Sequence, residues 1–333
     1  MEGVRFRILG PGEGNVLGRA IRASYGDSYD AAWVYDPAEV SARLEDGRYV
    51  SCIAEGAEGE LLCHVGLARS SAADRVGHSG QAVTMLAARG QHLFTQTKRH
   101  LVGWAREAGL AGMYMEATAA HPYSQLANVE LGAMETGFLL GWIPATVAND
   151  ATERAGRQSA ALLYLKTGDG DDRPVHAPPR HQAVVAQTIE ACGLRGRPAE
   201  PPAGLEPQAR TELRCEVRED HNIAILTVIA PGADLDEVVG AERHHLFRRG
   251  LDAVYVDLPL EQPATALVSA HLERLGVSYA GIFPNRHADG DVLRMQSLHR
   301  VRVSPGDVAV GSEHGRELLD YVLSDLPPDL ATG

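Results

Sequence analysis

The sequence contains an internal repeat. The segment GMYMEATAAHPYSQL, which starts at residue 112, aligns without a gap on AVYVDLPLEQPATAL, which starts at residue 253, and LGAMETGFLLGWIP further along resembles LGVSYAGIFP. The matched residues are Tyr114 with Tyr255, Glu116 with Asp257, Pro122 with Pro263, and Leu126 with Leu267. Self-similarity of this kind predicts one unit of strand, turn, helix and strand that occurs twice. Chance similarity of two such units is the alternative to a tandem duplication.

Length and composition agree with two domains. The 333 residues provide for about two domains of roughly 150 residues each. Between them, TGDGDDRPVHAPPR and GRPAEPPAGLEPQ are so rich in Pro and Gly that no helix or strand is expected there, whereas HQAVVAQTIEACGL has helical spacing. We therefore predict a first domain over 1–167, a linker with one helix over 168–210, and a second domain over 211–333.

Hydrophobic periodicity predicts a mixed α+β fold, a sheet flanked by helices. Apolar residues in QHLFTQTKRHLVGWAREAG recur at helical spacing, and Pro122 opens a short helix in PYSQLANVELGA. Two earlier helices are expected over 16–23 and 37–44. The predicted strands of the first domain are 4–9, 49–54, 61–68, 81–87, 112–118, 136–142 and 160–166.

Charge and composition exclude several classes of function. A formal net charge of -13 argues against general nucleic-acid binding, which needs clustered cations. No stretch approaches the roughly 18 to 20 apolar residues of a membrane span, and the N-terminal MEGVRFRILG has no long apolar run, so we expect a cytoplasmic protein without a membrane partner. The four cysteines form no CxxC pair, which predicts structural thiols and no metal site.

The first domain resembles the GNAT superfamily of N-acyltransferases. The resemblance is carried by the strand QAVTMLA, the turn AARGQHLF before a long helix, the strand MYMEATAAHPYSQ, and LGAMETGFLLGW after the short helix. It implies two tandem GNAT-like domains and a central strand that diverges from its neighbour to bind pantetheine. A helix N-terminus offers free N–H donors to a phosphate, which supports the role that the family gives to the turn.

The turn departs from the family pattern Q/R-x-x-G-x-G/A, because only its central glycine, Gly90, is retained. This departure raises the alternative that an acyl carrier protein, rather than free acyl-CoA, brings the phosphopantetheine arm. A basic patch of Arg89, Lys98, Arg99 and His100 is the candidate docking surface for such a carrier. The resemblance assigns cofactor binding to Thr84, Met85, Leu86, Arg89, Gly90, Gln91, His92, Leu93, Ser124 and Asn128.

Three residues suit the chemistry of N-acyl transfer, in which an amine loses a proton and a leaving thiolate gains one. His121 can take the ammonium proton, and Tyr123 lies near the place where the family has a residue that protonates the thiolate. Glu116 lies in an apolar strand, where a carboxylate needs a partner. It can orient His121, bind the amine, or act as the base through water. A structural role at the turn for His121 and core packing for Tyr123 are the alternatives.

The aromatic segment SYGDSYDAAWVYDP falls where the superfamily covers its acceptor with two early helices. Aromatic and acidic side chains together suit a polar, possibly cationic small molecule. The substrate-binding candidates are Tyr25, Asp27, Tyr29, Trp33 and Tyr35. Packing of a loop over the sheet is the alternative.

The second domain has Gln262 in place of His121 and Ala264 in place of Tyr123, and it has no phosphate turn. We therefore expect a degenerate copy that scaffolds the first domain, completes its acceptor site or docks a partner. A second active domain is the alternative. His244 and His245 are adjacent on a predicted helix, so they point apart and are expected to face solvent rather than a metal.

The sequence thus predicts an N-acyltransferase that moves an acyl group from acyl-CoA or an acyl carrier protein to the amine of a small molecule. Biosynthesis of a specialised metabolite, such as an antibiotic, is the expected setting. A non-catalytic module that binds acyl-CoA or a protein is the alternative.

Overall fold

The computed structural model describes residues 3–29, 31–147, 156–287, 290–328 and 330. The first half of the chain, from β1 to β7, contains β1 Arg5–Ile8, α1 Asn15–Tyr25, α2 Pro37–Glu45, β2 Tyr49–Glu55, β3 Leu61–Ala68, β4 Val76–Thr84, α3 Leu93–Glu107, β5 Gly112–Thr118, α4 Tyr123–Glu130, β6 Met134–Ile143 and β7 Gln158–Lys166. The mixed α+β fold is confirmed. The strand predicted over 81–87 is confirmed only over 81–84, because β4 begins earlier, at Val76, and ends at Thr84, and a 3₁₀ turn occupies Leu86–Ala88.

The connecting segment is more ordered than its composition predicts. It contains β8 Arg173–Val175, α5 Gln182–Ala191 and β9 Gly196–Pro198, and the two short strands pair in parallel. The predicted helix is α5, and its Val185 and Ile189 are buried. The composition misled here because two three-residue strands need few good strand formers when a helix packs against them.

The second half, from β10 to α8, contains β10 Glu212–Arg218, β11 Ile223–Ala230, α6 Leu235–Arg248, β12 Ala253–Pro259, α7 Pro263–Val268, β13 Ser278–Phe283, β14 Val292–Leu298 and α8 Glu313–Ser324. In both halves a parallel strand pair is followed by a helix and an antiparallel hairpin: β11 and β12 pair as β4 and β5 do, and β14 lies beside β12 as β7 lies beside β5. The repeat predicted from the sequence is confirmed.

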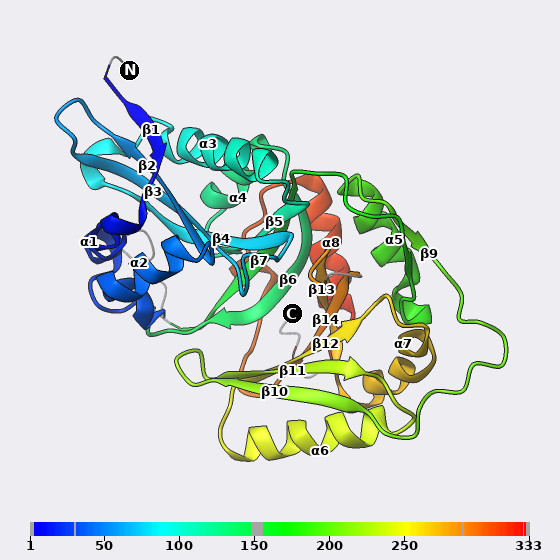
Figure 1. Cartoon of the computed structure of the whole chain (residues 1–333). Helices are drawn as coiled ribbons and strands as arrows, with labels where there is room; N and C mark the ends of the chain where they lie inside the picture. Colours follow the sequence, from blue (N-terminus) through cyan, green and yellow to red (C-terminus); the bar gives the residue numbers. More distant parts are fainter. Residues whose placement is uncertain (1–2, 30, 148–155, 288–289, 329, 331–333) are drawn as a thin grey trace.

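One sheet runs through both halves, in the order β1-β2-β3-β4-β5-β7-β6-β13-β14-β12-β11-β10. Figure 1 shows α1 and α2 on one side of the first half, α3 on the other side, and α6 beneath β10 and β11. The face of α3 that carries Leu93, Leu101 and Ala105 is buried in the core, as its spacing predicts.

The two halves of the sheet join where β6 crosses β13. The only paired residues are Gly137 and Gly281, and the backbones approach so closely that a Cβ atom on Gly137 would lie 2.2 Å from the carbonyl oxygen of Ala280. Beside the crossing, Gln296 accepts a hydrogen bond from the Leu140 N–H (3.0 Å) and Tyr255 donates one to the Leu140 carbonyl (2.8 Å). Because β6 and β13 pair at a single position, the backbone groups of Leu140 are hydrogen-bonded by side chains of the second half and not by a neighbouring strand.

Candidate active site

Strands β4 and β5 diverge, as the family resemblance implied. They pair only from Val76 with Gly112 to His78 with Tyr114, although both strands continue for several residues. Beyond the pair of His78 and Tyr114, the backbone N–H and C=O groups of β4 that face β5 are not paired with those of β5. The fork between these strands leaves room for an extended ligand that takes up strand-type hydrogen bonds.

A bulge bends β4 just above the fork. Val83 pairs with His64 and Gly80 pairs with Gly66, so two residues of β4 lie opposite one residue of β3, and Gln81 has a positive φ of 48°. Such a bulge re-aims backbone groups and increases the local twist.

Buried His64 holds the bulge in place. Burial lowers the pKa of His64 to about 4, so the ring is neutral at pH 7. Its Nδ1 lies 2.7 Å from the Gln81 carbonyl oxygen, which can only accept, and therefore Nδ1 carries the proton. Nε2 then accepts from the Ser51 hydroxyl at 2.6 Å.

His78, Tyr114 and Glu116 form a cluster at the base of the fork. The His78 ring stacks on the Tyr114 ring with centroids 5.0 Å apart, and His78 Nε2 lies 3.7 Å from Glu116 Oε2. Burial lowers the pKa of His78, while Glu116 partly raises it again. A neutral imidazole beside a carboxylate, where two strands part, can accept a proton from a bound amine.

His78 is a residue that the sequence analysis missed. Glu116 was predicted, but its proposed partner was His121, whereas His78 is the histidine that its carboxylate meets among the described residues. The expected strand begins at residue 81, which leaves His78 outside the predicted strands. The alternation of VGHSGQAV from residue 76 is the signal that could have found it.

His121 and Tyr123 lie together at the start of α4. Their ring centroids are 4.8 Å apart, and Tyr123 is 72% exposed. Burial lowers the pKa of His121, so this ring too is neutral at pH 7. The pair forms a second group that can exchange protons, at the end of β5 rather than at the base of the fork.

Three buried polar atoms near α4 have no partner among the described residues: His121 Nδ1, Ser124 Oγ and Asn128 Oδ1. Asn128 is only 2% exposed, and its Nδ2 donates to the Ser124 carbonyl (2.7 Å), which leaves the Oδ1 atom as a free acceptor. Buried polar atoms are rarely left unsatisfied, so these atoms indicate a ligand with amide or hydroxyl groups.

The turn between β4 and α3 adopts left-handed conformations at Gly90 (φ 77°) and His92 (φ 55°). His92 is the N-cap of α3 and makes no side-chain cap, which leaves the first amides of this helix open to an anion. Of the other predicted cofactor residues, Leu86, Arg89 and Gln91 are exposed on the turn, Met85 is partly buried at the end of β4, the Thr84 hydroxyl meets Cys63 Sγ (3.5 Å), and the Leu93 side chain is buried.

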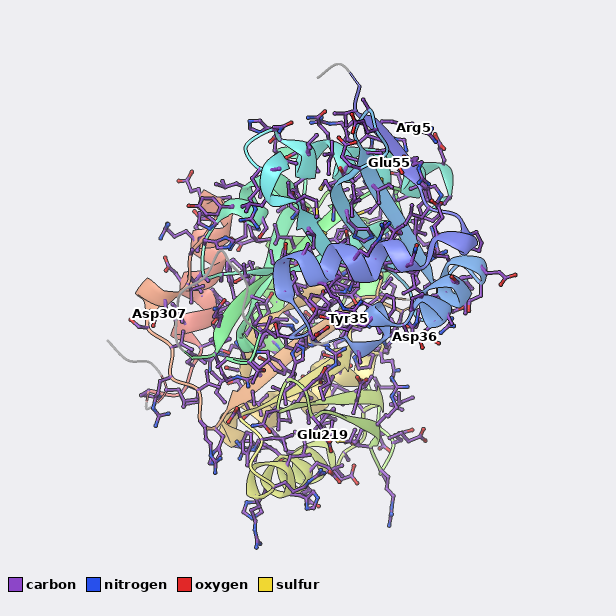
Figure 2. The ribbon with its side chains drawn as sticks, turned by 90° about the vertical axis from the view of Figure 1, so that its left-hand side faces the viewer. Arg5, Tyr35, Asp36, Glu55, Glu219 and Asp307 are labelled. Carbon is purple, nitrogen blue, oxygen red and sulfur yellow. The ribbon has the colours of Figure 1, made fainter. Side chains whose placement is uncertain are left out.

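The aromatic segment packs on the α1 and α2 side of the sheet, the side of Tyr35 and Asp36 in Figure 2. Tyr25 and Tyr29 meet edge to face, and Trp33 packs in the same way on buried Tyr49. Tyr35 donates to the Gly26 carbonyl (2.8 Å), and exposed Asp27 pairs with Arg22 (3.1 Å). His78 lies on this same face, because it pairs with Ala68, which packs against the aromatic cluster.

The corresponding place in the second half is closed. Asp257, the counterpart of Glu116, receives two hydrogen bonds from buried Arg294 (2.7 and 2.8 Å), and β11 and β12 stay paired up to Asp257. Gln262, the counterpart of His121, donates to the Ile229 carbonyl (2.8 Å). A hollow of about 240 Å³ beside it is lined partly by linker residues 205–208. Because both oxygens of the Asp257 carboxylate accept hydrogen bonds from Arg294, this carboxylate is not free to act as a base.

In the structure, the basic surface patch predicted from the sequence does not include Lys98, because this side chain is buried. Lys98 is 1% exposed, and its ammonium contacts the Ser79 hydroxyl beneath β4. It lies three and seven residues before Leu101 and Ala105, on the buried face of α3. Of the others, Arg99 pairs with Glu130 (3.7 Å), and Arg89 and His100 are exposed.

Replacing Lys98 with Met should stabilise the protein. Burial lowers the pKa of Lys98 to about 7, against about 10.4 for an unfolded chain, so protonation costs folding energy below that pH. The cost is complete below about pH 7 and disappears as the pH rises to about 10. We expect a gain of a few kcal/mol at pH 7 in urea unfolding, since one pKa unit is about 1.4 kcal/mol.

The matched control is Lys166→Met, since Lys166 is the only other lysine and is partly exposed beside Asp169. Its effect should stay within about 0.5 kcal/mol. A Lys98→Met variant that is less stable than wild type at both pH 7 and pH 10 would contradict the assignment.

Among the described residues, no group of three or more His, Cys, Asp and Glu side chains is placed to hold a metal ion, and no helix is long and apolar enough to cross a membrane. His244 and His245 are both exposed on α6.

No protein-family model and no curated protein matches the chain. Solved structures similar to it include the spermidine/spermine N-acetyltransferase SpeG from Vibrio cholerae with manganese ions (14% identity, 50% of this chain and 93% of that chain, TM-score 0.39). Others from that organism are a dodecameric spermidine N-acetyltransferase (15% identity, 50% and 95%, TM-score 0.39) and a complex with CoA and spermine (14% identity, 50% and 97%, TM-score 0.39). These similarities span half of this chain and assign it no substrate.

Proposed function

We propose that this chain is an N-acyltransferase of the GNAT type, which moves an acyl group from a coenzyme A thioester to the amine of a small molecule. The observation that carries the proposal is the fork between β4 and β5, with Glu116 and neutral His78 at its base. This arrangement supports a site where an extended thioester arm meets a proton acceptor.

Residues around α4 and the β4–α3 turn support the binding of an acyl-CoA donor. The unsatisfied Ser124 Oγ and Asn128 Oδ1 suit the amide groups of a pantetheine arm. The uncapped start of α3, with Gly90 and His92 in left-handed conformations, suits a phosphate. We therefore propose that the cofactor-binding residues predicted from the sequence bind the acyl-CoA donor.

The reaction is a direct transfer. The ammonium gives one proton to the His78 and Glu116 pair, the freed nitrogen bonds to the thioester carbonyl carbon, and the carbon–sulfur bond breaks. The nitrogen loses its second proton as the amide forms, which balances the proton taken up by the leaving thiolate. The departing thiolate takes a proton from an acid on the donor side, and we propose Tyr123, whose ring packs beside His121, for this role. His121 as the base is the competing arrangement. The aromatic segment from Tyr25 to Tyr35 covers the acceptor.

We assign this chemistry to residues 1–167, with 168–210 as the connection and 211–333 as a non-catalytic half. The closed Asp257 and Arg294 pair supports the division. A role in the biosynthesis of a specialised metabolite stays a prediction from the sequence.

The test is release of free thiol from acetyl-CoA with a panel of amines, compared with an acetylated carrier protein at equal concentration. We expect amine-dependent release from acetyl-CoA. Silence with both donors and every amine would contradict an acyltransferase and favour a binding module.

A carrier protein remains the alternative donor, favoured by the exposed apolar side chains of Leu86, Tyr123 and Leu126 at the ends of β4 and β5. In that case kcat/KM is higher with the acylated carrier and falls more steeply with salt, since charges at a contact rim mainly change association rates. Arg99→Ala then slows the reaction with the carrier without changing acyl-CoA binding, because Arg99 lies in the candidate docking patch but outside the β4–α3 turn.

A further inference from the structure

We infer that the second half supplies the acceptor site with a carboxylate-binding residue, Arg286, and that the acceptor is an amine that carries a carboxylate. The inference rests on the proposed function and adds to it the class of the acceptor. It begins from the loop between β13 and β14, which reaches the cluster at the fork.

Arg286 lies against the fork cluster. Its guanidinium carbon is 5.0 Å from the centre of the Tyr114 ring, the same ring on which His78 stacks at 5.0 Å. Arg286 and the His78 ring are therefore no more than about 10 Å apart. Arg286 is exposed, and among the described residues no carboxylate pairs with it.

The residue before Arg286, Asn285, is held by hydrogen bonds to both halves, which fixes the position of the Arg286 backbone. The Asn285 N–H donates to buried Asp291 (2.8 Å), which is itself held by Arg173 at 2.6 and 2.9 Å. The Asn285 side chain donates to the Tyr164 hydroxyl (3.0 Å) on β7, in the first half. Phe283 also packs edge to face on Tyr114 (5.2 Å).

The charges around the cluster favour an anion beside the amine. Arg218 and Arg286, both from the second half, act electrostatically on His78 and Tyr114, and the carboxylate of Asp257 is already neutralised by Arg294. Glu116 is left as the carboxylate that faces this group. Arg218 is itself paired with Glu216 (3.2 Å), so Arg286 is the arginine of this group that pairs with no described carboxylate.

The geometry suits a small amino acid. A guanidinium binds a carboxylate through two parallel hydrogen bonds, which a lysine cannot reproduce. An amine at His78 and Glu116 and a carboxylate at Arg286, each with a hydrogen bond of about 2.8 Å, can be joined by one to three carbons. We therefore place the carboxylate of such an acceptor on Arg286.

The experiment compares matched acceptors in wild type and Arg286→Gln. With acetyl-CoA as donor, kcat/KM is measured for glycine, β-alanine and 4-aminobutyrate and for their carboxamides. The ratio of carboxylate to carboxamide is then compared between the two proteins, which cancels the different basicity of the amines. We expect this ratio to fall by about 10- to 100-fold in Arg286→Gln, the usual scale of a hydrogen-bonded ion pair.

Arg316→Gln, which removes an exposed arginine from α8, is the matched control and should leave the ratio as it is in wild type. Amines that are acylated with no effect of Arg286→Gln on the ratio, or with an equal loss for carboxylates and carboxamides, would overturn the inference and leave the proposed function intact.

A binding measurement keeps the inference testable without turnover. The same six compounds are titrated calorimetrically into the protein without a donor. We expect the carboxylates to bind wild type more tightly than Arg286→Gln, and the carboxamides to bind both equally. Equal binding of the carboxylates to both proteins would overturn the inference, whatever the outcome of the acylation assay.

Discussion

Glu116→Gln and His78→Gln should each lower kcat by about 100-fold or more, the usual scale of a positioned general base. His78 Nε2 lies 3.7 Å from Glu116 Oε2 at the base of the fork, so in the proposed mechanism either substitution removes one of the two groups that accept the proton. The measurement is thiol release under saturating acetyl-CoA, with melting temperature as the check that each variant is folded.

The pH profile separates this role from a structural one. The pKa of His78 is lowered chiefly by burial, so kcat/KM should fall only as the pH drops below the usual histidine range near 6.5. Glu116 raises the pKa of His78, and Glu116→Gln should therefore move the remaining acid limb to still lower pH. His78→Gln should remove that limb.

His121→Ala and Tyr123→Phe are the comparison variants. If His121 is the base, its replacement gives the loss of about 100-fold and removes the acid limb, while His78→Gln leaves the limb in place. A lower kcat in Tyr123→Phe, with an unchanged melting temperature, would support its role as the acid that protonates the thiolate.

Gly137→Ala should destabilise the protein by about 3 kcal/mol, at the upper end for an overpacked core site. The new Cβ would lie 2.2 Å from the Ala280 carbonyl oxygen and 2.4 Å from Gly281 Cα, and backbone atoms at this crossing cannot rotate away. Urea unfolding measures the change, and the midpoint should fall clearly below that of wild type.

The control for Gly137→Ala is Gly103→Ala on the long helix α3, where an added Cβ meets nothing within 4 Å. There alanine should be neutral or stabilising by up to about 1 kcal/mol, because it favours the helix. If both variants unfold at the wild-type midpoint, the close crossing of β6 and β13 is not what joins the halves.

Local sequence patterns were sufficient for much of the fold. β5 and β3 begin and end where alternation predicted, and the repeat located a second strand–helix–hairpin unit. β4 was misplaced because its bulge at Gln81 interrupts alternation and its first residues are small or polar. That error removed His78 from the candidate residues.

The rest of the site depends on contacts between distant parts of the chain. Glu116 meets His78 across strands, and Arg286 reaches Tyr114 from the other half, so no local pattern reports either pair. Lys98 is a different case. Helical spacing alone places it on the same face as Leu101 and Ala105, but lysine is almost never fully buried, so the sequence predicted a surface patch there.

The crossing of β6 and β13 also determines what happens if the halves are separated. β6 lies between β7 and β13 and is covered by α8, whose N-cap Ser312 donates to Glu135 (2.8 Å). A fragment that stops at residue 167 would turn β6 into an unprotected edge strand, with Phe138 and Trp142 no longer covered by the second half. Such edges recruit strands from other molecules. The second half therefore covers the β6 edge of the first half. It remains necessary for this reason even though it lacks the catalytic residues.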